Sequence, residues 1–468
     1  MSAPRNVLVL GSGPAGYVCA IRLAQLGQAV TVVEKERLGG TCLHVGCIPS
    51  KALIAAGALL ERIRRAGTMG IEVGELTVDV QKLVAWKAGL VERLSGGIGS
   101  LFEKHGIRVV PGAARIVDRH TVEVTAGGAV SRLAADDLVI ATGSGPAPLP
   151  GFDFDGAHVW SSTEALAPDR VPEHLLVIGA GYIGLELGFL YHSLGSRVTV
   201  VEFTEGALPG QDRDCVKVIE RSLKKRKIAL HTRSAARGYA VKKKGLEVTV
   251  EGADGTATTI ACDQILCTVG RLPSTAGLGL ENAGLVPGDG GFLTVDSRMR
   301  TAVPNIYAIG DVAGQPMLAH KGSREGLVCA GVIAGRPEEY DARCVPAVIF
   351  TSPEMAAVGL GEAEAKAHGR EVRVGQFPFA ALGRALAMQE TEGFVKVVAD
   401  ARTDELLGVQ MVGPEVTELI AEAALAIELG ATAEDVARTI HAHPTLPEAL
   451  MEAAESVHGL AVHVFPRR

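Results

Sequence analysis

Hydrophobic and polar positions along the chain predict strands and helices in alternation from its beginning. Val7 to Leu10 is a short apolar run, a glycine-rich turn follows it, and a helical pattern then continues to Gly27. The segment AVTVVE, which ends in Glu34, is a second apolar run. Strand, glycine turn, helix and strand in this order are typical of a unit built on a parallel sheet.

The same unit occurs a second time, 168 residues further along the chain. LLVIGAGYIG repeats the first strand and its turn, and LGSRVTVVE, which ends in Glu202, repeats LGQAVTVVE. In each copy the acid stands 23 residues after the first glycine. Each copy later passes through short alternating segments, which predict an antiparallel meander, into a returning strand that ends before Gly143 or Gly270. The chain therefore contains two related α/β domains.

In the rest of the chain, the pattern of apolar and polar positions predicts helices at about 51–66 and 78–105. It also predicts a strand at 305–309 with another helix after it. From about Cys344 the pattern changes to alternating strands followed by an amphipathic helix at 416–430. This change indicates a separate α+β unit at the end of the chain.

The two glycine turns carry the residues of a dinucleotide-binding fingerprint. The residues are Gly11, Gly13, Gly16 and Glu34 in the first copy, and Gly179, Gly181, Gly184 and Glu202 in the second. The glycines permit a tight turn and a close approach of pyrophosphate, the helix N-terminus favours the phosphate charge, and the acid accepts a ribose hydroxyl. One such motif is weak evidence, but two complete copies predict two bound dinucleotides.

Two cysteines, Cys42 and Cys47, lie in the segment GGTCLHVGCIPSK. In a regular helix their Cα atoms would be about 8.6 Å apart, which is too far for a disulfide, so a bond would need a distorted turn. The glycines permit such a turn, and a strained, reducible pair suits catalysis; on spacing alone, two buried apolar thiols remain the alternative. Cys262 and Cys267 have the same spacing in ACDQILCTVG, which reads as one strand and would hold them apart.

Composition narrows the class of protein. Hydrophobic residues make up 47% of the chain and charged residues 21%, which is typical of a globular protein. The net charge of -7 excludes a broadly basic surface for nucleic acid or anionic lipid. Eight cysteines are too few for a disulfide-framed secreted domain, and no apolar run reaches the length of a membrane span. We therefore expect a cytoplasmic protein with redox-active rather than structural cysteines, and no metal site.

Two further places carry polar groups suited to chemistry. Asp311 ends a predicted strand before a helix start, where an acid can bind a polyol hydroxyl, although a simple helix cap is the alternative. His443 and Glu448 lie close together in HAHPTLPE. A histidine oriented by a carboxylate can act as a general acid and base, whereas the alternative is a surface histidine beside an unrelated acid.

Together, GGTCLHVGCIPSK, the two fingerprints, TAVPNIYAIGD and HAHPTLPE resemble the FAD-dependent pyridine nucleotide-disulfide oxidoreductases over essentially the full length. The resemblance implies an α/β fold with two Rossmann-like dinucleotide-binding domains, for FAD and NAD, and a C-terminal α+β dimerisation domain. The implied boundaries are 1–145 for the FAD domain, 146–272 for the NAD domain, 273–343 for a central domain and 344–468 for the dimerisation domain.

The resemblance also implies roles for single residues. Cys42 would exchange with a dithiol substrate, Cys47 would lie against the flavin as the thiolate, and His443 would be the acid and base oriented by Glu448. Lys51 would pair with Glu186 beside the flavin. The first fingerprint would bind the ADP part of FAD, with Asp311 on the ribityl chain and Ala319 near the pyrimidine edge of the ring. The second would bind NAD, and Gly143 and Gly270 complete the two cofactor sites.

The implied reaction is oxidation of protein-bound dihydrolipoamide to lipoamide, with electrons passing through the Cys42 and Cys47 disulfide and FAD to NAD. The implied partners are a second copy, in a homodimer, and the lipoyl domains of 2-oxo acid dehydrogenase or glycine cleavage complexes. Relatives with a C-terminal redox cysteine pair are disfavoured because the last cysteine is Cys344. NADPH-dependent reductases are disfavoured because no basic residue follows Glu202 before Arg213.

Two residues depart from the family pattern. His44 stands where the family usually has Asn, and Pro447 directly precedes Glu448. A purely structural subunit of a multienzyme complex is the hypothesis from another class, and other acceptors of electrons also stay open. Flavin content and dithiol-dependent NADH formation distinguish the enzyme from the structural subunit.

Overall fold

The computed structural model describes residues 4–465. It contains two compact units, each formed from two separate stretches of the chain. The first unit combines Met1–Val171 with Thr268–Asp341, and the second combines Pro172–Cys267 with Ala342–Arg468.

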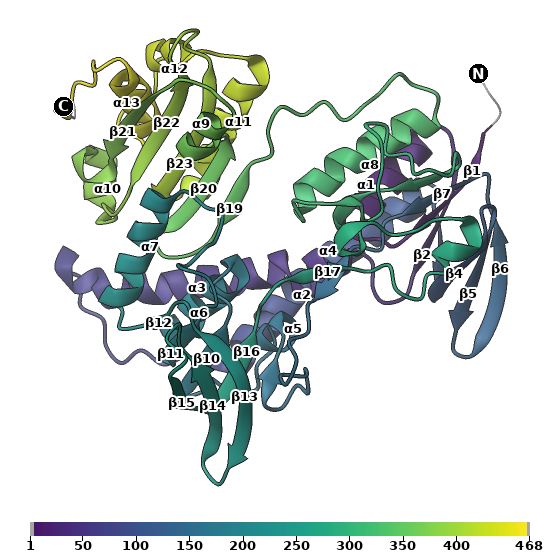
Figure 1. The fold of residues 1–468 in the computed structure, drawn as a ribbon, viewed down its shortest axis with the longest axis horizontal. Helices are drawn as coiled ribbons and strands as arrows, with labels where there is room; N and C mark the ends of the chain where they lie inside the picture. The colour runs from purple at the N-terminus through teal and green to yellow at the C-terminus, as the bar shows by residue number, and fades with distance from the viewer. Residues whose placement is uncertain (1–3, 466–468) are drawn as a thin grey trace. The chain divides into compact units, whose positions relative to one another are not determined.

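A parallel sheet of five strands, in the order β18-β7-β1-β2-β3, forms the centre of the first unit (Figure 1). The strands are β1 (Asn6–Leu10), β2 (Ala29–Glu34), β3 (Arg108–Pro111), β7 (Asp137–Ile140) and β18 (Ile306–Ala308). Val7 and Val9 of β1 pack on the face covered by helices α1 (Pro14–Gln25) and α8 (Ala319–Ile333). Leu8 and Leu10 pack on the other face. Both faces are covered, which explains why these strands are continuous apolar runs.

The second face of this sheet is covered by a three-stranded meander. Its strands are β4 (Ala113–Asp118), β5 (Thr121–Ala126) and β6 (Ala129–Ala134). Ile116, Val122 and Val124 of the meander belong to the same core as Leu8 and Leu10. The sequence prediction of a meander between the helical stretches and the returning strand is confirmed.

Helices α1 and α8 lie side by side in the first unit (Figure 1). A side chain at Gly326 of α8 would come within 2.6 Å of the carbonyl oxygen of Ala15 in α1. The two helices can approach this closely because their facing residues are small. A side chain at Gly322, in the first turn of α8, would lie 3.2 Å from Cβ of Ala15, which places the beginning of α8 beside the glycine turn.

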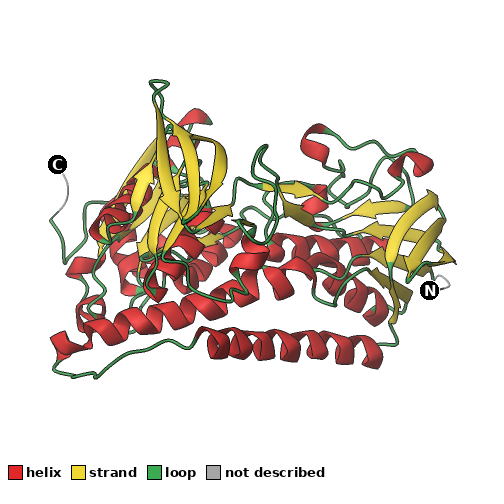
Figure 2. Cartoon of the chain, turned by 90° about the horizontal axis from the view of Figure 1, so that it is seen from below, coloured by secondary structure: helices red, strands yellow, loops and turns green. Residues whose placement is uncertain are grey.

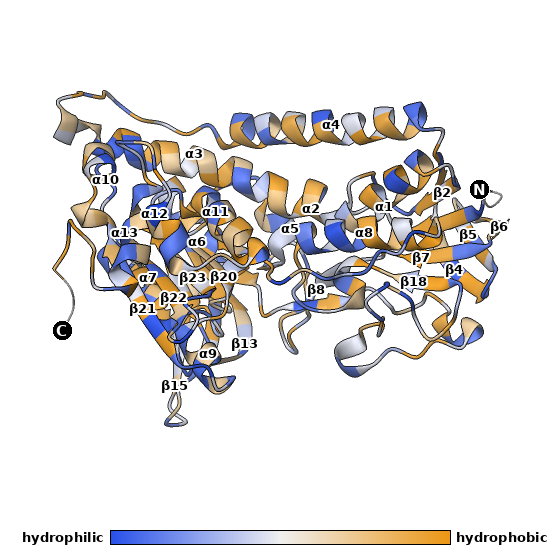
Figure 3. Cartoon of the chain, turned by 90° about the horizontal axis from the view of Figure 1, so that it is seen from above, coloured by the Kyte–Doolittle hydropathy of each residue, from blue (hydrophilic) through white to orange (hydrophobic). Residues whose placement is uncertain are grey.

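The cysteine segment forms two helices. They are α2 (Gly40–Val45) and α3 (Cys47–Arg65), and η1 (Ala66–Met69) and α4 (Val80–Lys104) follow them. The predicted helices at 51–66 and 78–105 are therefore confirmed, and the longest helices are prominent in Figure 2. Figure 3 shows apolar and polar residues on different sides of α4. By length and composition alone the stretch Gly40–Met69 could cross a membrane, although its apolar helix is interrupted at Gly46.

Four parallel strands in the order β12-β11-β10-β16 repeat the same design in the second unit. They are β10 (His174–Ile178), β11 (Arg197–Val201), β12 (Ala229–His231) and β16 (Gln264–Cys267), with helices α6 (Tyr182–Leu194) and α7 (Arg213–Lys225). The meander consists of β13 (Ala235–Lys242), β14 (Gly245–Glu251) and β15 (Ala257–Cys262). The reading of 261–270 as one strand is wrong, because the chain leaves the meander after Cys262 and joins the parallel sheet at Gln264.

The C-terminal part of the second unit is a five-stranded antiparallel sheet with helices. Its strands are β19 (Ala347–Ile349), β20 (Glu354–Gly359), β21 (Val372–Pro378), β22 (Phe394–Asp400) and β23 (Leu406–Gly413). Its helices are α9 (Glu362–Ala367), α10 (Gly383–Met388), α11 (Val416–Leu429), α12 (Ala433–Arg438) and α13 (Glu448–Val457). The α+β unit and the helix at 416–430 are confirmed.

Strands β22 and β23 are buried at every position, whereas their sequence predicted alternation of buried and exposed residues. Core residues from α11, α12 and α13 cover one face. On the other face, Lys396 is buried and forms ion pairs with Asp212 and Asp214 at the start of α7, at 2.7 and 3.0 Å. A polar residue that looks solvent-facing in the sequence is thus a buried ion-pair partner.

Short elements complete the chain. They are β8 (Ser144–Pro146), β9 (Val159–Trp160), α5 (Ser162–Ala165), β17 (Arg271–Pro273), η2 (Leu280–Ala283), η3 (Asp289–Gly291), η4 (Gly310–Ala313) and η5 (Phe379–Ala381). Strands β8 and β17 pair with each other in the first unit and place Pro273 opposite Ser144.

Candidate active site

The first glycine turn has the tight geometry that its sequence predicts. Gly11 has φ of 102°, and a side chain there would meet the carbonyl oxygen of Ala141 at 2.5 Å. A side chain at Gly16 would come within 2.1 Å of the carbonyl oxygen of Gly11. Among the described residues, nothing lies within 4 Å of the corresponding position at Gly13. Two glycines are therefore required by the protein itself, and the third leaves open space where a pyrophosphate would approach.

The helices that begin at the predicted cofactor sites lack a capping side chain. Gly13, Gly181 and Leu318 are the N-cap residues of α1, α6 and α8, and none accepts a hydrogen bond from the helix through its side chain. Asp79 caps α4 and Asp212 caps α7, whereas α11 and α13 also begin without a capping side chain. Uncapped N-terminal amides can bind anionic groups, so the residues present fit bound dinucleotides at these turns.

Glu34 lies at the end of β2, beside this turn. Its carboxylate accepts hydrogen bonds from the amide and the hydroxyl of Ser12, at 2.9 and 2.7 Å, and from the amide of Glu36. These contacts hold an acid where the ribose of a dinucleotide would lie. Sequence reasoning missed Ser12, although its position inside the glycine turn was a signal.

Asp311 lies in η4, directly after β18. Ser144 donates a hydrogen bond to the carboxylate of Asp311, and Arg271 donates to the hydroxyl of Ser144 at 2.8 Å. Gly143 precedes this serine with φ of 70°, and its carbonyl accepts from the amide of Ser274. Asp311 is therefore a member of a polar network and does more than cap a helix. Ser144 and Arg271, the other members, lie far from it in the chain and could not be predicted from local patterns.

A buried ion pair supports the loop that carries Asp311. Lys321 and Glu325, one turn apart on α8, are 3.0 Å apart with side chains only 4% and 9% exposed. Lys321 also donates to the carbonyls of Gly310 and Gly314, and Glu325 accepts from the amide of Gly310. Burial raises the pKa of Glu325, although Lys321 opposes this change. Sequence reasoning missed this pair; its signal is an i, i+4 Lys and Glu in a helix of small residues.

The predicted Ala319 is the first residue of α8, at the end of the same loop. The cofactor residues of the first copy therefore come together in one unit. Gly270 also lies in this unit, where its carbonyl accepts a hydrogen bond from the amide of Ala147.

The cysteines lie on either side of a break between two helices. Gly46, with φ of -140° and ψ of -116°, ends α2, and Cys47 is the first residue of α3. This is the distorted turn that the spacing required. The amide of Gly39 donates a hydrogen bond to the carbonyl of Ser12 at 3.0 Å, which links the cysteine segment to the first glycine turn. The cysteines are thereby attached to the first cofactor site.

The two sulfurs differ in their surroundings. Both side chains are thiols in the structure. A hydrogen bond with the side chain of Cys47 raises the pKa of the Cys42 thiol, burial raises it further, and the charge of Lys51 only partly opposes these effects. Cys47 lies at the positive end of a 19-residue helix, with Lys51 one turn further along. Negative charge is therefore favoured on Cys47 over Cys42.

His44 lies between the cysteines on α2. Its Nε2 is 2.8 Å from the carbonyl oxygen of Leu38, which also accepts a hydrogen bond from Ser95. The Nε2 atom must then carry the proton, and the buried Nδ1 has no hydrogen-bond partner among the described residues. The departure at His44 thus presents an unused acceptor inside the redox segment.

The second glycine turn has the geometry of the first. Gly179 has φ of 98°, Gly181 is the N-cap of α6, and Gly184 is buried in the first turn of that helix. Glu202 accepts from the amides of Ala180 and Thr204, at 2.6 and 2.7 Å. The two copies thus place a carboxylate in equivalent positions.

Glu186 is buried in α6 and accepts a hydrogen bond from the amide of Phe350 at 2.9 Å. Its expected partner Lys51 belongs to the other unit, so their pairing stays a prediction.

The expected acid and base residues are in contact. Nδ1 of His443 is 2.8 Å from Oε1 of Glu448, and the amide of Thr445 donates to Oε2 of Glu448 at 2.8 Å. Burial raises the pKa of Glu448, but the hydrogen bonds from Thr445 and His443 outweigh it, so this pKa is below its usual value. The His443 side chain is 79% exposed. Pro447 precedes α13, which begins at Glu448, so this departure leaves the acid in place.

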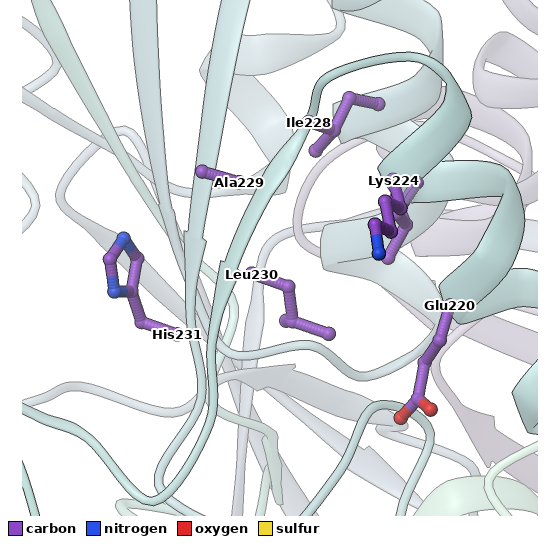
Figure 4. A pocket seen from close by; sticks show the side chains of 7 residues that line it. Glu220, Lys224, Ile228, Ala229, Leu230 and His231 are labelled. Carbon is purple, nitrogen blue, oxygen red and sulfur yellow. The ribbon is translucent and has the colours of Figure 1, made fainter.

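A pocket of about 380 Å³ lies between the end of α7 and the edge strand β12, and Figure 4 shows its side chains. Glu220, Lys224 and Leu230 are among the residues that line it. None of the predicted site residues does, so this pocket adds nothing to the assignment.

Comparison with known proteins agrees with this geometry. The sequence pattern of the pyridine nucleotide-disulphide oxidoreductases matches residues 5–326, and the pattern of their dimerisation domain matches residues 345–454. The chain therefore belongs to the pyridine nucleotide-disulphide oxidoreductase family. This family membership confirms the predicted fold class, the class of flavoprotein oxidoreductase and the use of FAD and NAD(H).

Similar curated proteins carry one name. A dihydrolipoyl dehydrogenase of Haloferax volcanii is 48% identical over 466 residues, which cover 99% of this chain and 98% of that protein. A dihydrolipoyl dehydrogenase of Thermus scotoductus is 47% identical over 464 residues, 99% of each chain. The crystal structure of LpdA from Mycobacterium tuberculosis has a TM-score of 0.90 at 32% identity, covering 96% of this chain and 99% of that one. The HOCl-induced flavoprotein disulfide reductase RclA from Escherichia coli has a TM-score of 0.86 at 27% identity, over 96% and 99%.

Proposed function

We propose that the chain is a dihydrolipoyl dehydrogenase, which oxidises protein-bound dihydrolipoamide and transfers the electrons through Cys42, Cys47 and FAD to NAD. The observation that carries the proposal is the thiol pair on either side of the break between α2 and α3, linked to the first of the two glycine turns. The full-length relatives of the same name support it.

The two cysteines act in sequence. In the oxidised enzyme a thiolate of the dithiol substrate attacks Cys42, breaks the bond to Cys47 and leaves a mixed disulfide, and Cys47 leaves as the thiolate. The second substrate thiolate then attacks the substrate sulfur bound to Cys42, which releases the cyclic disulfide and a reduced Cys42. The helix N-terminus and Lys51 favour negative charge on Cys47 during this step.

FAD, when bound, would supply a two-electron acceptor for Cys47 and a hydride donor for NAD. Gly11, Gly13, Gly16 and Glu34 would hold its ADP part, and Asp311 its ribityl chain. Gly179, Gly181, Gly184 and Glu202 would hold NAD. The carboxylate of Glu202 would accept the ribose hydroxyls and repel a 2′-phosphate, which favours NAD over NADP.

His443 removes a proton from the incoming dithiol and returns it later. Its Nδ1 is held by Glu448, so Nε2 is the atom that accepts the proton. Such a group is needed because ordinary thiols, with pKa values of about 8.5, are mostly protonated at neutral pH.

The chain has a dimerisation domain, and the active site is shared across a homodimer in this proposal. Leu425, Leu429 and Ile440 expose 61%, 75% and 96% of their surface in the C-terminal part of the second unit. Exposed apolar residues of this size are typical of an interface. The further partners would be lipoyl domains of 2-oxo acid dehydrogenase or glycine cleavage complexes, in the cytoplasm.

The test is steady-state NADH formation from dihydrolipoamide and NAD by the FAD-loaded protein. Glutathione disulfide with NADPH is the competing reaction. The Cys47→Ser protein is the matched control, because it keeps a side chain of similar size without the second thiol, and it should lose the activity. Full dithiol activity in that variant, or a purified protein without flavin, would contradict the proposal and favour a structural subunit.

A further inference from the structure

A second histidine and glutamate pair lies on the helix that carries Glu448. Glu452 is one turn further along α13, and its Oε1 is in contact with Nδ1 of His463 at 2.5 Å. The Glu452 side chain is 5% exposed and the His463 side chain is 68% exposed. The arrangement repeats that of Glu448 and His443, in which the acid is also the more buried partner.

The chain after α13 is fixed in this position by more than the ring. The amides of Val462 and His463 point to Oε2 of Glu452, at 3.1 and 3.5 Å. Val464 packs against the core of the C-terminal part. His463 is therefore a placed residue rather than a loose end of the chain.

The spacing of the two acids couples the pairs. Residues i and i+4 on a helix have Cβ atoms about 5–6 Å apart, so the carboxylates of Glu448 and Glu452 lie on one face and repel each other when both are ionised. Positive charge on His463 offsets this repulsion. The charge of His463 also lowers the pKa of Glu448. This effect is smaller than those of burial, of the hydrogen bonds from Thr445 and His443, and of the charge of His443.

Most charged residues on the neighbouring elements have other partners. Among the described residues, Arg438 of α12 pairs with Glu434, Lys396 of β22 with Asp212 and Asp214, Asp400 with Arg370, and His441 with Glu422, while Asp435 caps α12. Glu455 of α13 and Arg373 of β21 are the other charged residues on these packed elements. The groups in direct contact with the two acids are therefore the two histidines and backbone amides.

We propose that His463 and Glu452 form a positioning pair that sets the pH at which His443 accepts a proton. The proposal rests on the function of His443 given above. His463 is in contact with Glu452 and can offset the charge of that carboxylate, so that His443 interacts mainly with Glu448. Loss of either member of the pair changes the charge one helical turn from Glu448, the partner of His443, and the two losses act in opposite directions.

The experiment measures the turnover of the FAD-loaded enzyme with dihydrolipoamide and NAD against pH. The acidic limb of the curve of turnover against pH reports protonation of His443, which must be neutral to accept a proton. His463→Gln leaves Glu452 as an unbalanced anion, favours protonated His443 and moves this limb to higher pH. Glu452→Gln removes the anion, keeps an oxygen for the amide of Val462, and moves the limb to lower pH. Charges this close give shifts of about half to one pH unit.

His463→Lys retains the positive charge and is the rescue variant, with a limb near that of the wild type. A merely structural role would lower turnover in all three variants without moving the limb in opposite directions, and that result overturns the proposal. The His443→Gln variant tests the role of His443 as acid and base separately from the role of His463 and Glu452. It should lose about 10²–10⁴ of turnover. If it does and the limbs stay in place, only the role of His463 and Glu452 is wrong; if it keeps full turnover, the acid and base assignment fails and this proposal fails with it.

Discussion

Replacing Lys321 with Met tests whether the buried ion pair on α8 supports the cofactor loop. The change removes the positive partner of Glu325 and two hydrogen bonds, to the carbonyls of Gly310 and Gly314. Glu325 would be left as a buried carboxylate. Removing one partner of a buried pair costs about 3–5 kcal/mol, because the remaining charge keeps its desolvation penalty.

The assay is urea-induced release of FAD, followed by flavin fluorescence. With a denaturant slope of about 3 kcal/mol/M, the loss of 3–5 kcal/mol lowers the midpoint of release by about 1–1.7 M. Arg324→Met is the matched control, since Arg324 lies on the same helix and its ion pair with Asp341 is exposed, at 46% and 71%. An exposed pair contributes at most about 1 kcal/mol, so its midpoint should move far less.

The double variant Lys321→Met with Glu325→Gln separates charge from packing. Gln can still accept from the amide of Gly310, and no unpaired charge remains, so most of the stability should return. This expectation agrees with the raised pKa of Glu325, which indicates that burial costs the carboxylate more than its partners return. Equal midpoints for Lys321→Met and Arg324→Met would refute the reasoning.

Three further predictions concern the redox cysteines, the choice between NAD and NADP, and the sharing of the active site between subunits. Cys42→Ser should show long-wavelength absorbance without reductant, because the Cys47 thiolate stays beside the flavin; absence of the band counts against the assigned roles. Glu202→Ala should narrow the preference in kcat/KM for NAD over NADP, since a repulsive carboxylate is lost. If the wild-type protein used NADPH as well as NADH, the assignment of Glu202 as the residue that selects NAD would be wrong. Mixing His443→Gln with Cys42→Ser subunits should recover activity that neither has alone. No recovery despite proven exchange would show that His443 serves the cysteines of its own chain or none.

Sequence patterns predicted the elements that local periodicity defines. Both glycine turns, the helices at 51–66 and 78–105, and the break beside Cys47 follow from residues that are close in the chain. The strand boundary after Cys262 was missed, because apolar runs continue across it and only the pairing partners change.

Residues that depend on distant partners were not predictable. Ser144 and Asp311 are far apart in the chain, and only the folded unit shows that they bind each other. Lys396 looks like a surface residue of an alternating strand until Asp212 and Asp214 are placed over it. The domain boundaries and the roles of the individual site residues stay predictions.

The interleaving of the two units sets the order in which the protein can mature during synthesis. The first unit lacks β18, α8 and Asp311 until the chain has passed through 172–267, which belongs to the other unit. At the usual 5–20 residues per second, a ribosome needs about 5–19 s to make that intervening segment. During this interval β7 is an open sheet edge and the face of α1 that packs on α8 is uncovered. Nascent chains stalled before residue 311 should therefore fail to retain flavin and should depend on chaperones.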